Sequence, residues 1–330
     1  MNFTGLSYKR IIIVSAFFLI AIRSFSQDAL LFANSYLNPF IINPAITGSE
    51  IYPQADLAAN KQWLAFPNSP GTYSLAAHAR IGFFDFYDPK GFVNKGPLDL
   101  KDRIGLGGAV FRDNNGPLST TSIILSYAYH IPINIDSRLS FGMSLLGSFY
   151  SINTSMLKPD QLNDPYLFAG NGNSFRANFG FGAFYYSPAY FAGISASKLL
   201  PDVTNVNGQL KEQPGFFVIG GYKFLKDNSN LTIEPSVTIK KFASQNLAAD
   251  LHAKFYIRRL NWIAVSYSTT KNVNFMFGLH LYKMVYIAYN YGYTVSKIAS
   301  YNYGSHEIHL GINLGLTAIS GIRTTVNDTN

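Results

Sequence analysis

The residues of this chain with the clearest potential for chemistry lie near its C-terminal end, in the sequence His306-Glu307-Ile308-His309. Imidazole nitrogens and carboxylate oxygens at such short spacing can ligate a metal ion. On an extended strand, however, Glu307 and His309 point to one side and His306 points to the other. We therefore expect no metal site and interpret Glu307 and His309 as polar side chains on one face of a strand.

Other titratable side chains also fall on the polar face of a segment in which apolar and polar residues alternate. Two interpretations are open. We favour a hydrated interior in which charges pair across neighbouring strands, and the alternative is a dedicated ligand site. The candidate residues are Glu234, Lys240, Asp250, His252, Lys254, His280, Glu307 and His309.

Signatures of catalysis and of cofactor binding are weak. The sequence Gly105-Leu106-Gly107-Gly108-Ala109-Val110 resembles the start of a dinucleotide fingerprint, but Val110 stands where the last glycine is required and no helical pattern follows. Glycines facing the interior of a barrel explain these residues better. No motif pairs one serine with one histidine as nucleophile and base. We expect no enzyme, no catalytic residue and no cofactor.

The elements that must position these residues are strands, because apolar residues recur with a period of two. Between Ser122 and Ile131, for example, Ile123, Leu125, Tyr127, Tyr129 and Ile131 form one face. About fourteen such segments predict an all-β transmembrane antiparallel barrel. They are Gln54–Trp63, Thr72–Ile81, Ile104–Phe111, Ser122–Ile131, Arg138–Phe149, Arg176–Tyr186, Tyr190–Ser197, Phe216–Phe224, Leu231–Lys240, Leu247–Tyr256, Leu260–Tyr267, Phe275–Tyr282, Val285–Val295 and Glu307–Leu316.

The N-terminus and the composition favour a membrane barrel over a soluble sandwich. Lys9 and Arg10 precede the apolar stretch Ile11–Ile22, which is too short for a spanning helix and is typical of a secretory signal peptide. Only 13% of residues are charged, too few to cover a soluble β protein, while 48% are hydrophobic. There is no cysteine, so neither a disulfide nor a lipid anchor on cysteine is expected. The net charge of +8 is spread without a basic run and argues poorly for nucleic acid.

We accordingly divide the chain into a signal peptide (1–26), a periplasmic or lumenal N-terminal segment (27–53), an outer-membrane barrel (54–316) and a polar tail (317–330). Whether Asp28–Tyr52 enters the lumen as a plug or stays in the periplasm is left open by the sequence. Long odd-numbered connections and short even-numbered ones predict that both termini face the periplasm. Gly82–Asp102 is a long exception, and we interpret it as either a docking segment for partner proteins or a solvated loop.

Several separate blocks of the sequence resemble the PorP/SprF-type proteins of the type IX secretion and gliding machinery of Bacteroidetes. The mature start Gln27-Asp28 is followed by Asn38-Pro39, Asn43-Pro44-Ala45 with Gly48, and Lys61-Gln62-Trp63. Further matching blocks are Asp113 to Ser119, Ser126 to His130, Leu139 to Gly142, Phe179 to Ala183, Tyr186-Ser187-Pro188 and Gly304 to Ile308. Thr121-Ser122 departs from the more usual Thr-Gly pair.

The resemblance implies a non-enzymatic outer-membrane barrel without catalytic residues. It also implies its partners: outer-membrane lipid, a secreted adhesin with a type B C-terminal domain, and periplasmic type IX secretion components. On this hypothesis the barrel supports export or surface anchoring of the adhesin. The alternative from another class is a channel or transporter for small or hydrophobic solutes, because a barrel of this size can enclose an open lumen.

Overall fold

The computed structural model describes most of the chain between residues 36 and 314. The described ranges are 36–50, 52–65, 68–81, 103–134, 136–153, 156, 173–200, 213–225, 230–243, 245–257, 261–281, 284–295 and 303–314. The expected signal peptide and polar tail therefore lie outside the described residues. So do the whole of Gly82–Asp102 and the greater part of the other long connections. Within the described part, no helix is long and apolar enough to span a membrane.

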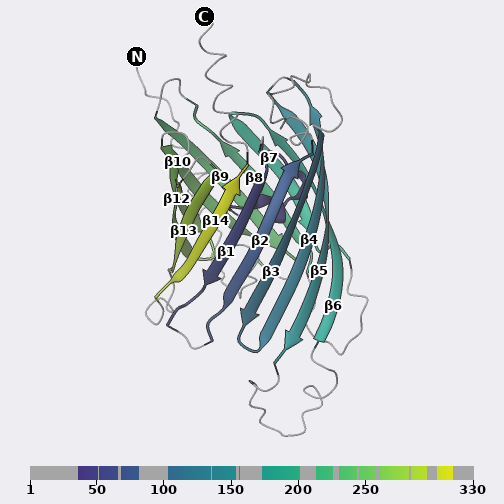
Figure 1. Cartoon of the computed structure of the whole chain (residues 1–330), viewed down its shortest axis with the longest axis vertical. Helices are drawn as coiled ribbons and strands as arrows, with labels where there is room; N and C mark the ends of the chain where they lie inside the picture. Colours follow the sequence, from purple (N-terminus) through teal and green to yellow (C-terminus); the bar gives the residue numbers. More distant parts are fainter. Residues whose placement is uncertain are drawn as a thin grey trace, which may run out of the picture.

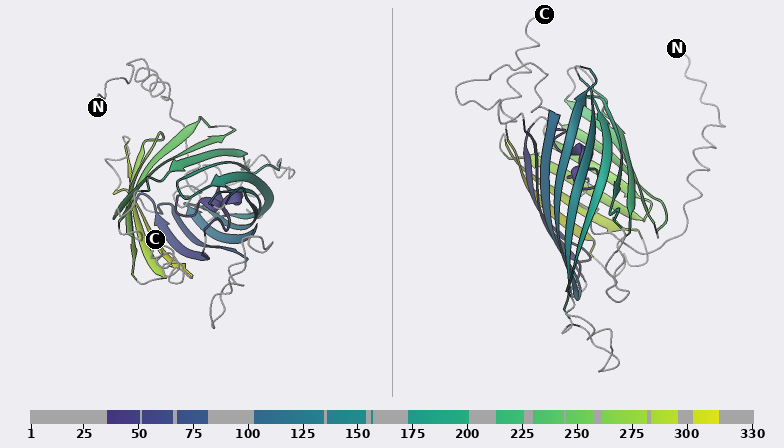
Figure 2. Two further views of the ribbon diagram at one scale, coloured as in Figure 1. Left: turned by 90° about the horizontal axis from the view of Figure 1, so that it is seen from above. Right: turned by 90° about the vertical axis from the view of Figure 1, so that its right-hand side faces the viewer.

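Fourteen antiparallel strands form a single closed barrel, which confirms the predicted fold class (Figures 1 and 2). Each strand pairs with its neighbours in sequence, and β14 returns to pair with β1, where Gln54 lies opposite Asn313. The strands are β1 Gln54–Lys61, β2 Gly71–Arg80, β3 Ile104–Asn115, β4 Leu118–Pro132, β5 Arg138–Ile152, β6 Asn173–Tyr186, β7 Tyr190–Ser197, β8 Gly215–Tyr222, β9 Leu231–Phe242, β10 Ala248–Ile257, β11 Asn261–Ser268, β12 Asn272–His280, β13 Val285–Thr294 and β14 Ser305–Asn313.

The main differences from the sequence prediction concern strand lengths. Strands β3 and β4 continue through the segment 112–121, which the period-two pattern left as a connection, and only Gly116 and Pro117 join them. Gly116 adopts a positive φ of 59°, which a tight turn requires. Polar residues occupy both faces of this hairpin, so its sequence carries no apolar alternation. In Figure 1, β3 to β6 reach farther toward the lower end than β1, β2 and β14 do.

The expected alternation of long and short connections is correspondingly less regular than the sequence suggested. Two odd-numbered connections are short: Gly116-Pro117 between β3 and β4, and Thr269–Lys271 between β11 and β12. A short polar turn can join two adjacent strands wherever both end at the same height, and this holds on either rim of a barrel. Loop length alone is therefore weak evidence for orientation in this chain.

The outer surface of the barrel is apolar on alternate residues of every strand. Leu57, Leu125 and Ile194 leave 55%, 59% and 61% of their surface exposed, although each lies within a strand. In water such a surface would be costly, whereas lipid accommodates it and the closed ladder satisfies the backbone. The outside of the barrel is therefore a lipid-facing belt.

A charge placed on this belt is expected to destabilise the barrel. Leu125 lies at the middle of β4, so Leu125→Arg should cost about 2–4 kcal/mol of unfolding free energy in lipid vesicles, measured by urea titration. Ile133→Arg is the matched control, because Ile133 is 56% exposed in the turn after β4 and should cost roughly 0–1 kcal/mol. Equal losses for the two variants would contradict a lipid-facing assignment.

Candidate functional site: the plugged lumen

The interior of the barrel holds the residues 36–50, which we call the plug (Figure 2). The plug contains two short 3-10 turns, Pro39–Ile41 and Pro44–Ile46, and each follows an asparagine. Proline is favoured at the first position of such a turn because it has no N–H to leave unpaired. The side chain of Asn43 accepts a hydrogen bond from the Ala45 N–H at 3.0 Å and so caps the second turn. The repeated Asn-Pro pair thus builds a compact, doubly turned segment.

Apolar side chains of the plug fill the part of the lumen bounded by β2 to β9. Phe40 and Ala45 are fully buried, and Ile41, Ile42 and Ile46 are nearly so. They form one cluster with side chains of the inner wall: Ala76, Ala109, Phe111, Ile124, Phe184, Phe217, Ile219 and Phe242. Because these contacts exclude water from both surfaces, the plug and this wall form one hydrophobic core.

Polar side chains of the wall bind the main chain of the plug. Ser195 donates to the Ile42 carbonyl at 2.7 Å, and Ser140 donates to the Ala45 carbonyl at 2.6 Å. The Arg80 guanidinium donates to the carbonyls of Gly48 and Ser49 at 3.0 and 3.2 Å. His130 Nε2 lies 2.9 Å from the Thr47 carbonyl oxygen. The wall thereby supplies hydrogen-bond partners for backbone groups of the plug. These groups have no partner in a β-sheet ladder, because the plug is not part of a strand.

Glycines give the plug the space to approach the strands. A Cβ atom at Gly142 would lie 2.3 Å from the Ala45 nitrogen, and one at Gly182 would lie 2.0 Å from Asn43 Oδ1. A Cβ atom at Gly105 would lie 2.0 Å from the Thr47 carbonyl oxygen. Gly105 belongs to the sequence that resembles a dinucleotide fingerprint, and its role here is close approach of two backbones.

A buried charged network fastens the other side of the plug. Asp56 on β1 accepts hydrogen bonds from Asn38 of the plug at 3.1 Å and from the Tyr286 hydroxyl at 2.8 Å. His309 Nδ1 lies 2.9 Å from Asp56 Oδ1, and His309 Nε2 lies 3.0 Å from Glu307 Oε1. The Nδ1 contact is a hydrogen bond and the Nε2 contact is an ion pair, so a doubly protonated imidazole places one positive charge between two carboxylates. Asn60 and Asn290 each donate to Glu307 Oε2 at 3.3 Å.

The structure therefore brings Glu307 and His309 together, with Asp56 as the third member of the group. Among the described residues, no group of three His, Cys, Asp or Glu side chains is suited to hold a metal ion. Asp56 was missed in the sequence, although the period-two pattern does place it on the inner face of β1. The pattern also places Arg80, His130 and Ser140 on the inner face of their strands, and they were missed for the same reason. Alternation shows which face of a strand a side chain lies on, but not which partner it contacts.

The remaining candidate residues lie along β9, β10 and β12. Lys240 and Asp250 form an ion pair of 2.8 Å across β9 and β10. Glu234 binds Lys223 at 3.1 Å and accepts a hydrogen bond from the Tyr256 hydroxyl at 3.2 Å. His280 lies 3.5 Å from the Asn313 amide nitrogen, measured from its Nε2. Charge pairs thus connect neighbouring segments of this wall.

Two further candidate residues, His252 and Lys254, contact Tyr36 of the plug. The ring of His252 stacks on the Tyr36 ring with centroids 4.5 Å apart. The Lys254 ammonium lies 4.3 Å from the centroid of Trp262, 4.8 Å from that of Tyr256 and 5.8 Å from that of Tyr36. Burial raises the pKa of the Tyr36 hydroxyl, which keeps the phenol neutral. Lys254 thus serves as a cation among aromatic rings and contacts the plug.

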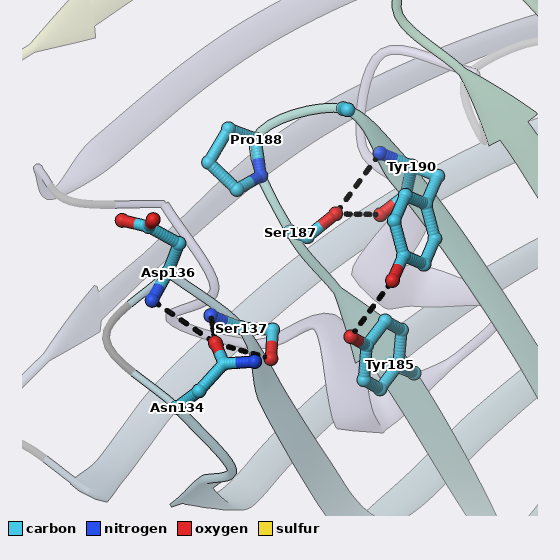
Figure 3. Close-up of a pocket in the computed structure, with 8 residues that line it drawn as sticks. Asn134, Asp136, Ser137, Tyr185, Ser187, Pro188 and Tyr190 are labelled. Atoms are coloured by element: carbon cyan, nitrogen blue, oxygen red, sulfur yellow. Dashed lines mark hydrogen bonds between the residues drawn. The ribbon is translucent and has the colours of Figure 1, made fainter.

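A shallow hollow lies at one rim, between the β4–β5 and β6–β7 turns (Figure 3). The Tyr185 and Tyr190 hydroxyls lie 3.2 Å apart, and Ser187 Oγ donates to the Tyr190 carbonyl at 3.0 Å. Asn134 Oδ1 accepts hydrogen bonds from the Ser137 N–H and hydroxyl, both at 2.7 Å. These polar groups bond mainly to one another and stabilise the two turns.

A closed antiparallel barrel with a lipid-facing belt and an inner segment packed against its wall defines a plugged β-barrel of the outer membrane. The chain belongs to the family described as type IX secretion system membrane protein PorP/SprF, whose model matches residues 24–312. The family assignment and the barrel together make it an outer-membrane protein of the type IX secretion system.

Solved structures with a similar barrel include the Acinetobacter baumannii outer membrane protein Omp33. It is 8% identical over 80% of this chain and 98% of its own, with a TM-score of 0.44. The KdgM porin is 12% identical over 79% of this chain and 97% of its own, with a TM-score of 0.36. A mutant of the Rh. blastica porin is 9% identical over 80% of this chain and 99% of its own, with a TM-score of 0.34. No curated protein matches the chain.

Proposed function

We propose that this barrel is a non-enzymatic receptor and anchor for a secreted adhesin with a type B C-terminal domain. The observation that carries the proposal is the plug, whose apolar side chains occupy the lumen between β2 and β9. A lumen that is packed with the protein's own residues suits a binding partner at its mouth better than free passage of solutes. The family assignment supplies the secretion context.

We further propose that both termini face the periplasm and that the long β3 to β6 wall stands at the cell surface. An even number of strands brings the start of β1 and the end of β14 to the same rim. Residues 1–26 would be removed as a signal peptide, and residues 82–102 would contact periplasmic secretion components. The layout of signal peptide, N-terminal segment, barrel and tail remains a prediction.

A solute channel is the second candidate, and one observation favours it. Inward-facing residues on β9 and β10, including Lys240 and Asp250, are partly exposed, in contrast to the buried wall opposite. Water could therefore follow the β9 and β10 side of the plug. Conductance of the purified barrel in planar bilayers separates the two candidates. Selective passage of a small solute, with no affinity for a type B domain, would favour the channel.

Deletion of the gene tests the anchor directly. In the deletion strain the partner adhesin is expected to disappear from the cell surface, measured by protease accessibility on intact cells and by blotting of the medium. Complementation with the intact gene should restore it. Unchanged export and surface attachment of every type B substrate in the deletion strain would contradict the proposal.

A further inference from the structure

Strand β6 extends well beyond the end of its neighbour β7. On one side β6 pairs with β5 along its whole length, from Tyr186 opposite Arg138 to Asn173 opposite Ser151. On the other side it pairs with β7 only from Tyr186 to Phe181, which lies opposite Ala196. After β7 the chain still follows β6, because the Leu199 N–H donates to the Phe179 carbonyl and the Leu200 N–H donates to Asn178 Oδ1 at 2.8 Å. The segment 173–177 therefore has one side paired with β5 and one side beyond the end of β7. We call this segment the β6 edge.

The backbone groups that face outward from the β6 edge can be identified from one hydrogen bond. The Phe179 carbonyl accepts from the Leu199 N–H at 3.2 Å, so residue 179 directs its polar groups to the β7 side. In an antiparallel ladder, alternate residues direct their N–H and C=O groups to the same side. Asn173, Phe175 and Ala177 therefore direct theirs away from β5. In the described part of the chain, no strand pairs with these three residues on that side.

We propose that the β6 edge binds an extended segment of the exported partner as an added β-strand. The chemistry is that of main-chain recognition, because a row of N–H and C=O groups at strand spacing is complementary to another strand. Three residues with both groups available offer up to six hydrogen bonds. This inference rests on the proposed anchor function, and it names the surface and the kind of partner segment.

Side chains beside the edge indicate what the added strand should carry. On the outer face, Phe175 packs on Phe149 with ring centroids 4.6 Å apart and is 52% exposed. On the inner face, the Arg176 guanidinium lies over the Tyr150 ring at 5.6 Å. Successive residues of a strand point to opposite faces. The partner segment should therefore place apolar residues on its outer face, where they contact Phe175, and alternate them with polar residues on its inner face.

Site-specific photo-crosslinking in intact cells tests the location. A photoreactive phenylalanine analogue replaces Phe175, and a matched control replaces Phe181, which faces the same way but borders the paired β7. We expect an adduct with the exported partner at position 175 that is at least about fivefold stronger than at position 181. Adducts at 175 only with the chain's own loops, only with a second copy of the barrel, or with nothing would overturn the proposal.

A proline substitution tests the main-chain mechanism. Ala177→Pro removes the N–H that faces the edge but leaves the pairing with β5, and proline is tolerated at sheet edges. The amount of partner that co-purifies with the tagged barrel should fall at least about fivefold, whereas Ala177→Val, which keeps the N–H, should stay within about twofold. Heat-modifiable migration on gels verifies that both variants fold.

The outcomes distinguish this inference from the proposed function. If gene deletion removes the partner from the surface while folded Ala177→Pro captures it normally, only the added-strand mechanism is wrong. If Ala177→Pro fails to fold, Phe175→Pro provides the same loss of one outward N–H two residues away. If deletion leaves the partner in place, the anchor function itself is wrong.

Discussion

Replacing Gly142 and Gly182 together with valine is expected to expel the plug from the barrel. Both Cβ positions would lie 2.0 to 2.3 Å from plug atoms, and neither the β5 nor the β6 backbone can retreat without breaking its ladder. Overpacking of this kind costs about 1–3 kcal/mol or more at each site. The plug is the element that can leave, since it belongs to no strand of the closed ladder.

Two measurements detect expulsion. The chain has no cysteine, so Ala45→Cys introduces a single thiol at a fully buried position of the plug. In the double valine variant this thiol should change from protected to readily labelled by a maleimide. Conductance in planar bilayers should rise by at least about tenfold, because an open barrel of this size holds water.

The control for this experiment is a pair of glycines on the opposite face of the wall. Gly108 and Gly220 have room for a Cβ atom, whose nearest neighbours would lie at 3.4 and 3.7 Å. Gly108→Val combined with Gly220→Val adds the same two side chains without touching the plug. A protected thiol and unchanged conductance in the Gly142 and Gly182 variant would show that the plug tolerates the added volume, which contradicts tight seating.

Removing the imidazole of His309 is expected to be the most damaging single truncation of the network. His309→Ala leaves the carboxylates of Asp56 and Glu307 buried and without their shared cation. Loss of one member of a buried ionic group costs about 3–5 kcal/mol. Urea titration of the barrel in lipid vesicles, followed by tryptophan fluorescence, measures the loss of unfolding free energy.

Two further variants make this prediction specific. His306→Ala removes a histidine from the outward face of the same strand, where it bonds the Tyr289 hydroxyl at 2.6 Å, and should cost about 1 kcal/mol. Adding Asp56→Asn to His309→Ala removes one of the stranded charges and should recover part of the stability. Purely additive losses would indicate that Asp56 and His309 are energetically independent.

Alternation with a period of two sufficed to locate all fourteen strands, because every strand must present apolar residues to lipid. The period-two pattern failed for strand residues outside the lipid-facing belt, because these residues need not present an apolar face to lipid. The β3–β4 hairpin stands beyond the belt, so Arg112 to Thr121 alternate in no apolar pattern and their strand character was missed.

The site was only partly predictable for a related reason. The phase of β14 placed Glu307 and His309 on the inner face, but their partner Asp56 is 253 residues away from His309 in sequence. No local pattern reports such a pairing. The Asn-Pro pairs at 38–39 and 43–44 suit turns in a plug and in a periplasmic segment alike. The burial of Phe40 and Ala45 against the wall, and the close approach of the plug to glycines of β3, β5 and β6, distinguish the two arrangements in the structure.

The position of the charged network at the junction of β1 and β14 has a consequence for assembly. Asp56 and Asn60 belong to the first strand, while Glu307 and His309 belong to the last. In a sheet that has not closed, Asp56 would lose His309 and Tyr286, and Asn60 would lose Glu307. Asp56 would then keep only its plug partner Asn38. Closure by any other register would strand a charge in the interior. The seam therefore selects its own register, because the native register is the one that pairs the buried charges of the first and last strands.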